Sequence, residues 1–297
     1  MKIVILGKGY VGTAICKHLR SIAEHDVLCY SKSDLEYTNN TRLVNMLLDI
    51  KPDVVINASG YTGKPNVDAC EHARDDTWYY NVTVPGMIGD TCNRHDVKFI
   101  HISSGCIYDG YEKAFDEFDL PNFGLLSEDS SWYSKTKHAG ELSLQGTDSH
   151  IFRIRMPFCE TGSDRSVMSK LLKYNNIIDQ LNSLTNIEDL CVFTEKYINK
   201  NISNNHPGAV LNVVNPQPVQ TSRVVEIMKN HGLNNPKWTT IDLTELKKYT
   251  KANRSNCVLS TTCISKIGLS MPNTEVSLDR CARAMSHEYF TKISKQG

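Results

Sequence analysis

The chain opens with a short apolar run that passes directly into a glycine loop. Residues 2–6 read KIVIL, and Gly7, Gly9 and Gly12 follow in the pattern GxGxxG before a segment of helical character. In this context the first glycine permits a tight turn, the second lets the backbone approach a pyrophosphate, and the third lets the helix pack closely. The N–H groups at the helix N-terminus would face the phosphates. The alternative is a glycine-rich turn without a ligand.

Further apolar, β-branched runs alternate with segments of helical periodicity. The runs are 2–6, 26–30, 53–59, 97–103, 149–157 and 209–214; the helical segments are 41–50, 78–94, the stretch around 133–137, 166–174, 221–231 and a C-terminal helix from about Thr274. Such apolar strands are typical of a parallel sheet that helices cover on both faces. The sequence therefore predicts an α/β fold built on a Rossmann-type doubly wound parallel sheet. The polar stretch NKNISNN at 199–205 predicts a loop.

The pattern becomes mixed beyond Pro157, which predicts two unequal parts. We expect an NADP-binding Rossmann domain at 1–155 and a smaller mixed α/β substrate-binding lobe at 156–297, with segments that return to the Rossmann sheet. A chain of 297 residues can bury a core of this size.

Composition narrows the class of protein further. Lysine plus arginine and aspartate plus glutamate both total 33, which argues against a nucleic-acid surface or a membrane anchor. Ten cysteines form neither a CxxC pair nor the spacing of a disulfide framework, so we expect no metal site and a reduced, cytoplasmic location. The sequence begins with a strand pattern rather than a leader, and it lacks an apolar run of about 18 residues.

The second apolar run ends in residues that bear on the choice of cofactor. Proteins that bind NAD normally place a carboxylate here for the adenosine ribose, but this sequence reads Tyr30-Ser31-Lys32-Ser33. Ser31 and Lys32 are suited to a 2′-phosphate, which favours NADPH, with NADH as the alternative. Asp34 follows, and it either caps the turn or approaches the adenine.

Tyr133 and Lys137 stand four residues apart in SWYSKTKHAG at 131–140. On a helix they share one face, so the lysine charge would favour the phenolate and lower the pKa of the tyrosine. An isolated YxxxK is more often a solvated helix face with a basic run. After a Rossmann-type half, however, this pair would supply the proton that reduction of a ketone requires. A hydroxyl from Ser104, at the end of the fourth run, would complete the clamp on the carbonyl.

With these residues in place, the sequence resembles the extended short-chain dehydrogenase/reductase family, whose catalytic triad matches Ser104, Tyr133 and Lys137. Residues 57–60 and Asn81 are similar to the family's cofactor-side turn and its buried helix asparagine; alone they would be ordinary turn and capping residues. The resemblance implies these cofactor-binding residues: Gly7, Gly9, Tyr10, Val11, Gly12, Ser31, Lys32, Asn57, Ala58, Ser59, Gly60, Asn81, Tyr133 and Lys137.

Longer blocks resemble one subfamily. They are NASGYTGKPNVDACE at 57–71, SSGCIYDG at 103–110, WYSKTK at 132–137, RIRMP at 153–157 and RSN at 254–256. These are similar to the UDP-4-keto-6-deoxyglucose 3,5-epimerase/4-reductases that make UDP-L-rhamnose in plants, with counterparts in giant viruses. The similarity spans nearly the whole chain and is clearest between residues 1 and 175. It implies that one site inverts C3 and C5 and then reduces C4 with NADPH.

The same resemblance assigns the epimerase base to Cys106 and the acid that reprotonates the opposite face to Lys170. The C3 and C5 protons flank the C4 ketone, so their removal gives an enolate that Ser104 and Tyr133 can stabilise. A thiolate is a suitable base if a cation is near. From the residues alone, Cys106 would be a buried small hydrophobe and Lys170 a solvated charge.

Substrate contacts are also implied by the resemblance. They are Thr62, Gly63, Lys64, Asn66 and Val67 in the sugar-facing loop, Ser104, Gly105 and Cys106 beside the ketone, and Arg254 and Asn256 towards the diphosphate. The sequence departs from the subfamily at three places: Lys64 stands where an arginine is common, Ser104 where a threonine is usual, and Ser260 near a usual aspartate. Lys64 keeps the charge but lacks the bidentate fork.

Two rival functions remain open at this stage. One is a 4-reductase of the dTDP-4-dehydrorhamnose reductase kind, which works with a separate epimerase and against which Cys106 argues. The other is a non-catalytic NADP-binding regulatory subunit, because members of one fold can lose their activity. For the main hypothesis we expect a 4,6-dehydratase on a separate chain to supply the keto sugar, and the resemblance implies a homodimer.

Overall fold

The computed structural model describes residues 1–294, with side chains through residue 287. Its strands are β1 (Lys2–Leu6), β2 (Asp26–Tyr30), β3 (Val54–Asn57), β4 (Lys98–Ser104), β5 (Gly110–Phe115), β6 (Ser149–Ile154), β7 (Asn176–Ile178), β8 (Leu181–Asn182), β9 (Val210–Asn212), β10 (Val219–Gln220), β11 (Thr239–Ile241) and β12 (Cys257–Leu259). The helices are α1 (Tyr10–Arg20), α2 (Asn40–Ile50), α3 (Arg74–Trp78), α4 (Val84–Arg94), α5 (Trp132–Leu142), α6 (Val167–Lys173), α7 (Ile187–Tyr197), α8 (Thr221–Asn230), α9 (Leu243–Leu246), α10 (Thr262–Lys266) and α11 (Thr274–Ser294). Four short helical turns complete the list: η1 (Val67–Glu71), η2 (Tyr79–Thr83), η3 (Gly105–Ile107) and η4 (Ile198–Ile202).

A parallel sheet of six strands forms the centre of the molecule. The strand order is β2-β1-β3-β4-β6-β9, and every neighbouring pair is parallel. The chain reverses its direction across the sheet between β1 and β3, where a doubly wound fold leaves a crevice at the carboxyl ends of the strands. The predicted fold class is therefore confirmed.

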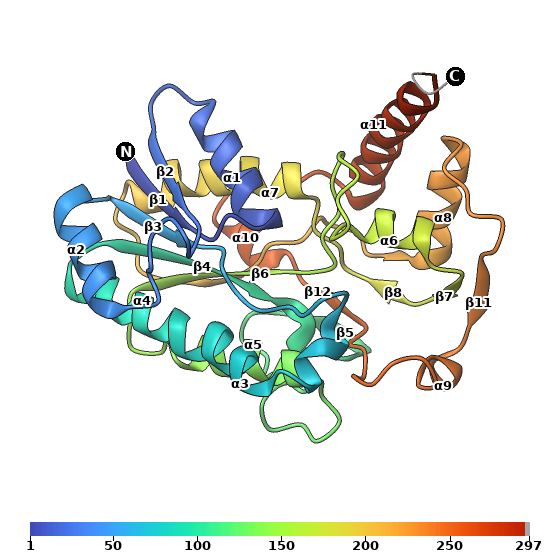
Figure 1. Ribbon diagram of the computed structural model, residues 1–297, viewed down its shortest axis with the longest axis horizontal. Coiled ribbons are helices and arrows are strands. Elements are labelled where there is room, and N and C mark those ends of the chain that lie inside the picture. Colours follow the sequence, from blue (N-terminus) through green and yellow to red (C-terminus); the bar gives the residue numbers. More distant parts are fainter. Residues whose placement is uncertain (295–297) are drawn as a thin grey trace.

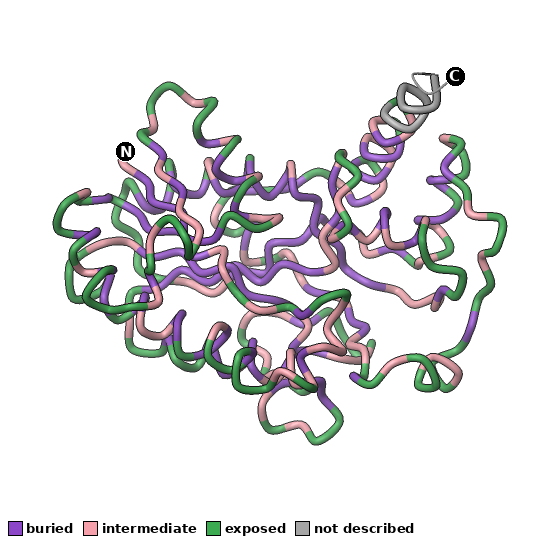
Figure 2. The backbone as a smooth tube through the Cα atoms, viewed as in Figure 1, coloured by how far each residue is buried: buried purple, intermediate pink, exposed green. Residues whose placement is uncertain are grey.

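Side chains of successive residues on each strand enter different cores. In β1, Ile3 and Ile5 pack with α1 and α7, whereas Val4 and Leu6 pack with α2 and α4. Figure 1 shows these two helical layers on opposite sides of the sheet, and Figure 2 shows the strands as the most continuously buried part of the chain. Burial on both faces explains why the strands are uninterrupted apolar runs.

A separate hydrophobic cluster lies beyond the sheet. It gathers apolar residues of α6, α8 and α11 around Phe158, and short strand pairs β8–β10 and β7–β11 border it. In Figure 1 these elements lie together at the end of the molecule away from β2. Two other parts of the second half return to the sheet: α7 packs on α1, and β9 pairs with β6.

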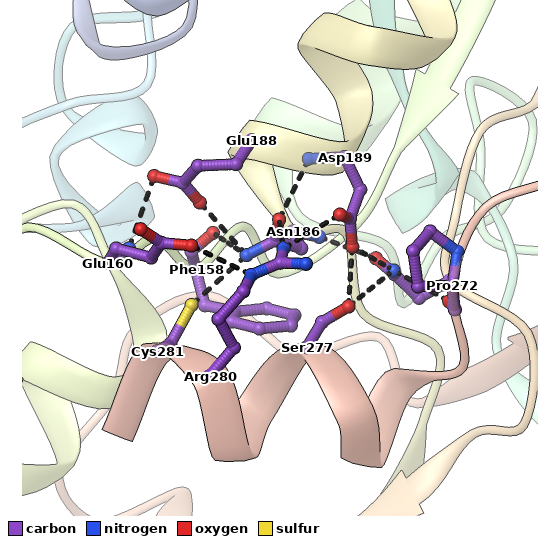
Figure 3. Close-up of polar contacts among 10 residues, drawn as sticks. Phe158, Glu160, Asn186, Glu188, Asp189, Pro272, Ser277, Arg280 and Cys281 are labelled. Atoms are coloured by element: carbon purple, nitrogen blue, oxygen red, sulfur yellow. Dashed lines mark hydrogen bonds and ion pairs between the residues drawn. The ribbon is translucent and has the colours of Figure 1, made fainter. Parts of the chain in front are cut away.

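Helix α11 is joined to the first turn of α7 by a buried polar network (Figure 3). Arg280 contacts the carboxylates of both Glu160 and Asp189 at 2.7 Å. Asp189 is 6% exposed and also accepts a hydrogen bond from Asn215 Nδ2 at 2.7 Å. Because a buried carboxylate needs a partner, these contacts fix α11 against the sheet-covering helix.

Two local predictions need correction. The segment 199–205 was expected to be a loop, but residues through Ile202 continue α7 as the π-helical turn η4, with Asn201 and Ile202 buried. The single helix expected at 78–94 is interrupted by the π-helical turn η2 before α4. Within residues 1–294, none of the helices has the length and apolar character needed to cross a membrane.

Candidate active site

The glycine loop lies at the carboxyl end of β1. Gly7 has φ +104°, and a Cβ added there would lie 2.7 Å from the backbone nitrogen of Ser59. A Cβ on Gly12 would lie 1.9 Å from the carbonyl oxygen of Gly7, whereas one on Gly9 would meet nothing within 4 Å. The outer two glycines are thus required for packing, and the middle one exposes backbone to open space. This pattern fits a pyrophosphate-binding loop.

The first turn of α1 and the end of β2 border this loop. Tyr10 and Val11 begin α1 and are partly buried. After β2, Ser31 is partly buried, and Lys32 is exposed with its ammonium 2.5 Å from the hydroxyl of Tyr80. The free ammonium hydrogens of Lys32 therefore remain available at the surface where a cofactor ribose would bind.

Asp34 caps the turn after β2. Its carboxylate accepts a hydrogen bond from the N–H of Ser31 at 2.8 Å and pairs with Lys8 at 2.6 Å. The Lys8 ammonium and the Ser31 N–H lower the pKa of Asp34 to about 2. Of the two roles considered for this residue, the structure supports the turn cap.

Asn57 shapes the turn at the end of β3. It is fully buried, and its Oδ1 accepts hydrogen bonds from the N–H and the hydroxyl of Ser59 at 3.0 and 2.5 Å. Ala58 continues the turn, with its N–H bonded to Leu6 O at 2.9 Å. This turn, residues 57–60, forms the wall against which Gly7 packs.

Asn81 lies in the π-helical turn η2 and is 1% exposed. Its Oδ1 accepts from Tyr61 N at 2.8 Å, and its Nδ2 donates to Tyr61 O at 2.9 Å and Thr136 Oγ1 at 3.1 Å. Asn81 therefore ties the chain after the 57–60 turn to α5. The extra residue of a π-turn explains how the Asn81 side chain reaches both the backbone of Tyr61 and the hydroxyl of Thr136.

Strand β4 ends at the hydroxyl of Ser104, and the turn η3 that follows it carries the thiol of Cys106. Ser103 donates to the carboxylate of Glu141 at 2.5 Å and so points away from the cleft. Ser104 accepts a hydrogen bond from Cys106 N at 3.2 Å and thereby caps the 3₁₀ turn η3. The turn presents a partly exposed Cys106, and Gly105 is needed because a Cβ there would lie 2.4 Å from Leu259 Cδ1.

Tyr133 and Lys137 project from one face of α5, as their spacing predicted. Burial, followed by the nearby Cys106 thiol, raises the pKa of Tyr133, and a hydrogen bond with Ser104 partly opposes that rise. Lys137 Nζ donates to Ile102 O at 3.2 Å, and burial lowers the pKa of Lys137 to about 8. The expected fall in the tyrosine pKa is therefore wrong for this structure, because burial dominates and Lys137 is not among the main groups that shift the pKa of Tyr133.

Lys170 lies on α6, across from these residues. Burial and the charges of Arg165 and Arg254 lower its pKa, while the thiol of Cys106 acts in the opposite direction. The thiol of Cys106 acts to raise the pKa of each of Tyr133, Lys137 and Lys170. The structure thus places the thiol of Cys106 near Tyr133, Lys137 and Lys170, and their shared role in a reaction remains a prediction.

The predicted sugar-facing loop lies beside α6. Thr62 and Gly63 each accept a hydrogen bond from Arg165 Nη1 at 3.0 Å. Lys64 is exposed, and Asn66 caps η1 by accepting from Asp68 N at 2.8 Å. Arg165 was not identified from the sequence, where it reads as one more surface arginine before a helix.

The RSN segment takes a different position from the one expected of a diphosphate clamp. Both Nη atoms of Arg254 are paired with the carboxylate of Asp68, at 2.9 and 3.0 Å. Asn256 is 5% exposed, and its Oδ1 accepts from Asn182 Nδ2 at 3.1 Å. Direct substrate contact by these two residues remains a prediction that requires the side chains to exchange partners.

Comparison with known proteins identifies the family of this chain. The sequence model of the RmlD substrate binding domain family matches residues 1–286. The trifunctional UDP-glucose 4,6-dehydratase/UDP-4-keto-6-deoxy-D-glucose 3,5-epimerase/UDP-4-keto-L-rhamnose-reductase RHM2 of Arabidopsis thaliana is 30% identical over 276 residues, covering 90% of this chain and 39% of that protein. The chain thus spans about two fifths of the length of RHM2 and its two trifunctional counterparts.

Two further proteins match over most of their length. A bifunctional dTDP-4-dehydrorhamnose 3,5-epimerase/dTDP-4-dehydrorhamnose reductase of Arabidopsis thaliana is 28% identical over 269 residues, 87% of this chain and 85% of that protein. The crystal structure of the L780 UDP-rhamnose synthase from Acanthamoeba polyphaga mimivirus superposes with a TM-score of 0.85 at 23% identity, covering 96% of this chain and 99% of that one. The resemblance predicted from the sequence is confirmed at the level of the family: with 286 of its 297 residues matched, this chain belongs to the RmlD substrate binding domain family.

Proposed function

We propose that this chain catalyses two steps on one nucleotide sugar: inversion of C3 and C5 of UDP-4-keto-6-deoxy-D-glucose, then NADPH-dependent reduction of C4 to give UDP-L-rhamnose. The observation that carries the proposal is the proximity of the Cys106 thiol to Tyr133, Lys137 and Lys170, with Ser104 capping the turn that bears the thiol. The relatives named for 3,5-epimerase and reductase activities support it. The substrate requires a preceding 4,6-dehydration of the sugar.

The glycine loop and the 57–60 turn would hold the cofactor. The fit rests on Gly9, where the backbone borders open space, and on Gly7 and Gly12, where a side chain has no room. Lys32 and Ser31 would bind a 2′-phosphate, which favours NADPH, because the carboxylate of Asp34 in this turn is already paired with Lys8. A bound NADPH supplies the hydride that reduces C4.

In the reductive step Tyr133 donates the proton to the sugar O4. Its raised pKa keeps the phenol protonated at neutral pH, which suits a proton donor. Ser104, which acts to lower the pKa of the phenol, would bind the same oxygen. Lys137 lies one turn away on α5, and its ammonium would bind the nicotinamide ribose and help to restore the proton to Tyr133.

In the epimerisation step the thiolate of Cys106 removes the proton at C3, and separately that at C5. The electron pair of each broken C–H bond moves towards O4 as an enolate, which Ser104 and Tyr133 stabilise by hydrogen bonds. Lys170 returns a proton to the opposite face of the carbon. Its lowered pKa supports this role, because a lysine that loses its proton more easily is a better acid near neutral pH. Proton exchange with solvent resets the thiol and the amine.

The test is NMR spectroscopy of the purified protein with UDP-4-keto-6-deoxyglucose and NADPH in deuterated water. The proposal expects UDP-rhamnose that carries deuterium at both C3 and C5. Reduction without label would identify a reductase that depends on a separate epimerase. Binding of NADPH without turnover of any keto sugar would identify a regulatory subunit.

A variant separates the two steps. Cys106→Ala should abolish deuterium incorporation and turnover of the unepimerised sugar, yet keep reduction of pre-epimerised UDP-4-keto-rhamnose. Cys263→Ala is the matched control, because Cys263 is also partly exposed but lies on α10. Equal loss of both steps in Cys106→Ala would defeat the assignment of the thiol as the base.

A further inference from the structure

Arg155 is a buried arginine directly beyond β6. It is 1% exposed, and all its hydrogen-bond acceptors are neutral. They are Ser255 Oγ at 2.9 Å, Ser255 O at 2.7 Å, Asn182 Oδ1 at 2.5 Å and Gly105 O at 3.5 Å. Its Nε is buried without an acceptor, and across the side chains that the structure describes no carboxylate forms an ion pair with it.

The contrast with Arg153 makes this arrangement unusual. Arg153 lies two residues earlier, within β6, is similarly buried, and pairs with Glu141 at 2.7 Å. Burial of a charge is costly unless an opposite charge compensates it. Arg155 has no such carboxylate, so its surroundings favour the development of negative charge on whichever acidic group lies closest.

That acidic group is the thiol of Cys106. Arg155 Nη1 lies 3.6 Å from Cys106 Sγ, within hydrogen-bonding distance of a sulfur atom. The RSN segment holds the guanidinium there, because both the hydroxyl and the carbonyl of Ser255 accept from it. The segment 254–256 therefore contributes to the position of Arg155 through Ser255, whereas Arg254 pairs with Asp68.

We propose that Arg155 is the counter-ion of a Cys106 thiolate, and thus the positioning residue that makes the thiol a base in the pocket. The catalytic part of this inference rests on the proposed epimerase function; the ion pair itself does not. Four other ionisable groups face the thiol: Tyr133 and Lys137 from α5, Lys170 from α6, and Cys257 from β12.

Arg155 differs from the two lysines in ways that suit this role. Burial lowers the pKa of both Lys137 and Lys170, so each loses its proton more readily than an ordinary lysine does. A guanidinium stays charged at all relevant pH values, and its planar fork can bind sulfur with one N–H while the others hold the scaffold. The Arg155 charge therefore persists throughout the cycle in which Lys170 is proposed to give up its proton.

The first test needs no substitution. The full-length protein is treated with iodoacetamide across a pH series, and alkylation of Cys106 and of Cys263 is followed by peptide mass spectrometry. We expect Cys106 to reach half-maximal reactivity below the pH of about 8.5 at which an ordinary cysteine ionises. Cys263 is the internal reference, because burial and Glu117 raise its pKa to about 11. A Cys106 midpoint at or above pH 8.5 would overturn the ion pair.

The second test changes Arg155 itself. Arg155→Met should raise the Cys106 midpoint by about one pH unit or more and lower deuterium exchange at C3 and C5 by about tenfold or more. Arg155→Lys should keep the Cys106 midpoint and the rate of deuterium exchange close to the wild-type values. Reduction of pre-epimerised substrate should persist in both variants. Ser255→Ala removes one hydrogen bond but no charge, so the midpoint of Cys106 alkylation in this variant should stay at the wild-type value.

The outcomes separate the inference from the proposed function. If wild-type protein exchanges C3 and C5 and Arg155→Met exchanges at the same rate with an unshifted midpoint, the inference is wrong. If the midpoint shifts in Arg155→Met but wild-type protein never exchanges these protons, the ion pair exists and the epimerase function is wrong. Should Arg155→Met fail to fold, the wild-type midpoint and Arg155→Lys still decide the matter.

Discussion

At the scale of single residues, a substitution of Tyr133 can remove the proposed proton donor without removing the ring that packs in the fold. Replacement by phenylalanine removes only the hydroxyl, so the packing of the ring on α5 persists while the proposed proton donor is lost. We expect Tyr133→Phe to lower the rate constant for reduction by about two orders of magnitude or more. Single-turnover oxidation of NADPH with pre-epimerised substrate measures this step.

The control for Tyr133→Phe is Tyr249→Phe. Tyr249 is 61% exposed and lies beyond α9, so its hydroxyl should have no influence on reduction. Near-normal turnover in Tyr133→Phe would show that another group, such as Ser104, supplies the proton. A loss shared by both tyrosine variants would indicate a general effect on folding.

Lys137 gives the site a pH dependence of defined sign. Its pKa of about 8 in the folded chain lies below the ordinary 10.5, so the ammonium is lost as pH rises through 8. If the charge binds the cofactor ribose, kcat/KM for reduction should fall across this range. Rate measurements from pH 6 to 10, each at saturating and limiting NADPH, would reveal the fall.

Unfolding measurements distinguish that loss of activity from loss of structure. Between pH 8 and 10.5 Lys137 is protonated in a smaller fraction of folded chains than of unfolded chains. Its contribution to the unfolding free energy therefore increases with pH. The difference in unfolding free energy between wild type and Lys137→Met should therefore change in favour of wild type over this window. A constant difference would contradict the depressed pKa.

Single residues also show where prediction from sequence stops. Ser104, Tyr133 and Lys137 were named from local motifs, and Cys106 and Lys170 from the family resemblance. In the structure the Cys106 thiol lies near Tyr133, Lys137 and Lys170. Arg155 was visible only as part of RIRMP. Its partners come from Gly105, Asn182 and Ser255, which are far apart in the sequence. That Arg155 is held by neutral groups rather than by a carboxylate is therefore apparent only in the folded chain.

At the scale of elements, the contact between α5 and η2 depends on Gly140. A Cβ there would lie 2.2 Å from the carbonyl oxygen of Asn81, which is backbone and cannot rotate away. We expect Gly140→Ala to separate the two helices and lower the unfolding free energy by about 1–3 kcal/mol. Because Asn81 also bonds Thr136 on α5, the reductive rate should fall as well. Denaturant unfolding and NADPH oxidation would measure the two effects.

Gly9→Ala is the matched glycine substitution. The added Cβ meets no atom within 4 Å, and φ of Gly9 is −84°, which alanine adopts freely. Stability should therefore stay near the wild-type value, whereas NADPH affinity should decrease because the methyl group enters the space proposed for the pyrophosphate. Unchanged affinity would show that the loop does not approach the phosphates.

The elements themselves were predictable to different degrees. The buried strands were found because parallel strands covered on both faces are apolar throughout, as in Val54–Asn57. Helix α7 was not predicted, although Asn186 caps it and its buried residues recur at helical spacing. The polar stretch after it favours a loop by composition, but burial of Ile202 against the core that contains Phe193 overrides that preference.

At the scale of the whole molecule, the arrangement depends on contacts between distant parts of the sequence. Strand β9 completes the sheet beside β6, and α7 covers it beside α1, although both follow the boundary at 155/156 expected from sequence. Periodicity revealed that the second half contains such elements but not which surface each would cover. Side-chain pairing between α11 and α7 joins the C-terminal helix to the helix that covers the sheet (Figure 3).

Arg280 is the residue through which this placement can be tested. It pairs with the buried Asp189 and with Glu160, whereas Arg283, one turn along α11, pairs with Asp279 at an exposed site. Arg280→Met leaves the Asp189 carboxylate buried without its cation and should lower the unfolding free energy by about 2 kcal/mol. Arg283→Met breaks a surface pair and should cost about 0.5 kcal/mol or less.

Asp189→Asn supplies the decisive comparison, because it removes the charge that Arg280→Met leaves unpaired. The double variant should therefore be more stable than the sum of the two single losses predicts, by about 1 kcal/mol. Urea unfolding of the four proteins at pH 7 gives this coupling energy directly. Strict additivity, or equal losses in Arg280→Met and Arg283→Met, would show that the pairing of Arg280 with Asp189 does not hold α11 in place.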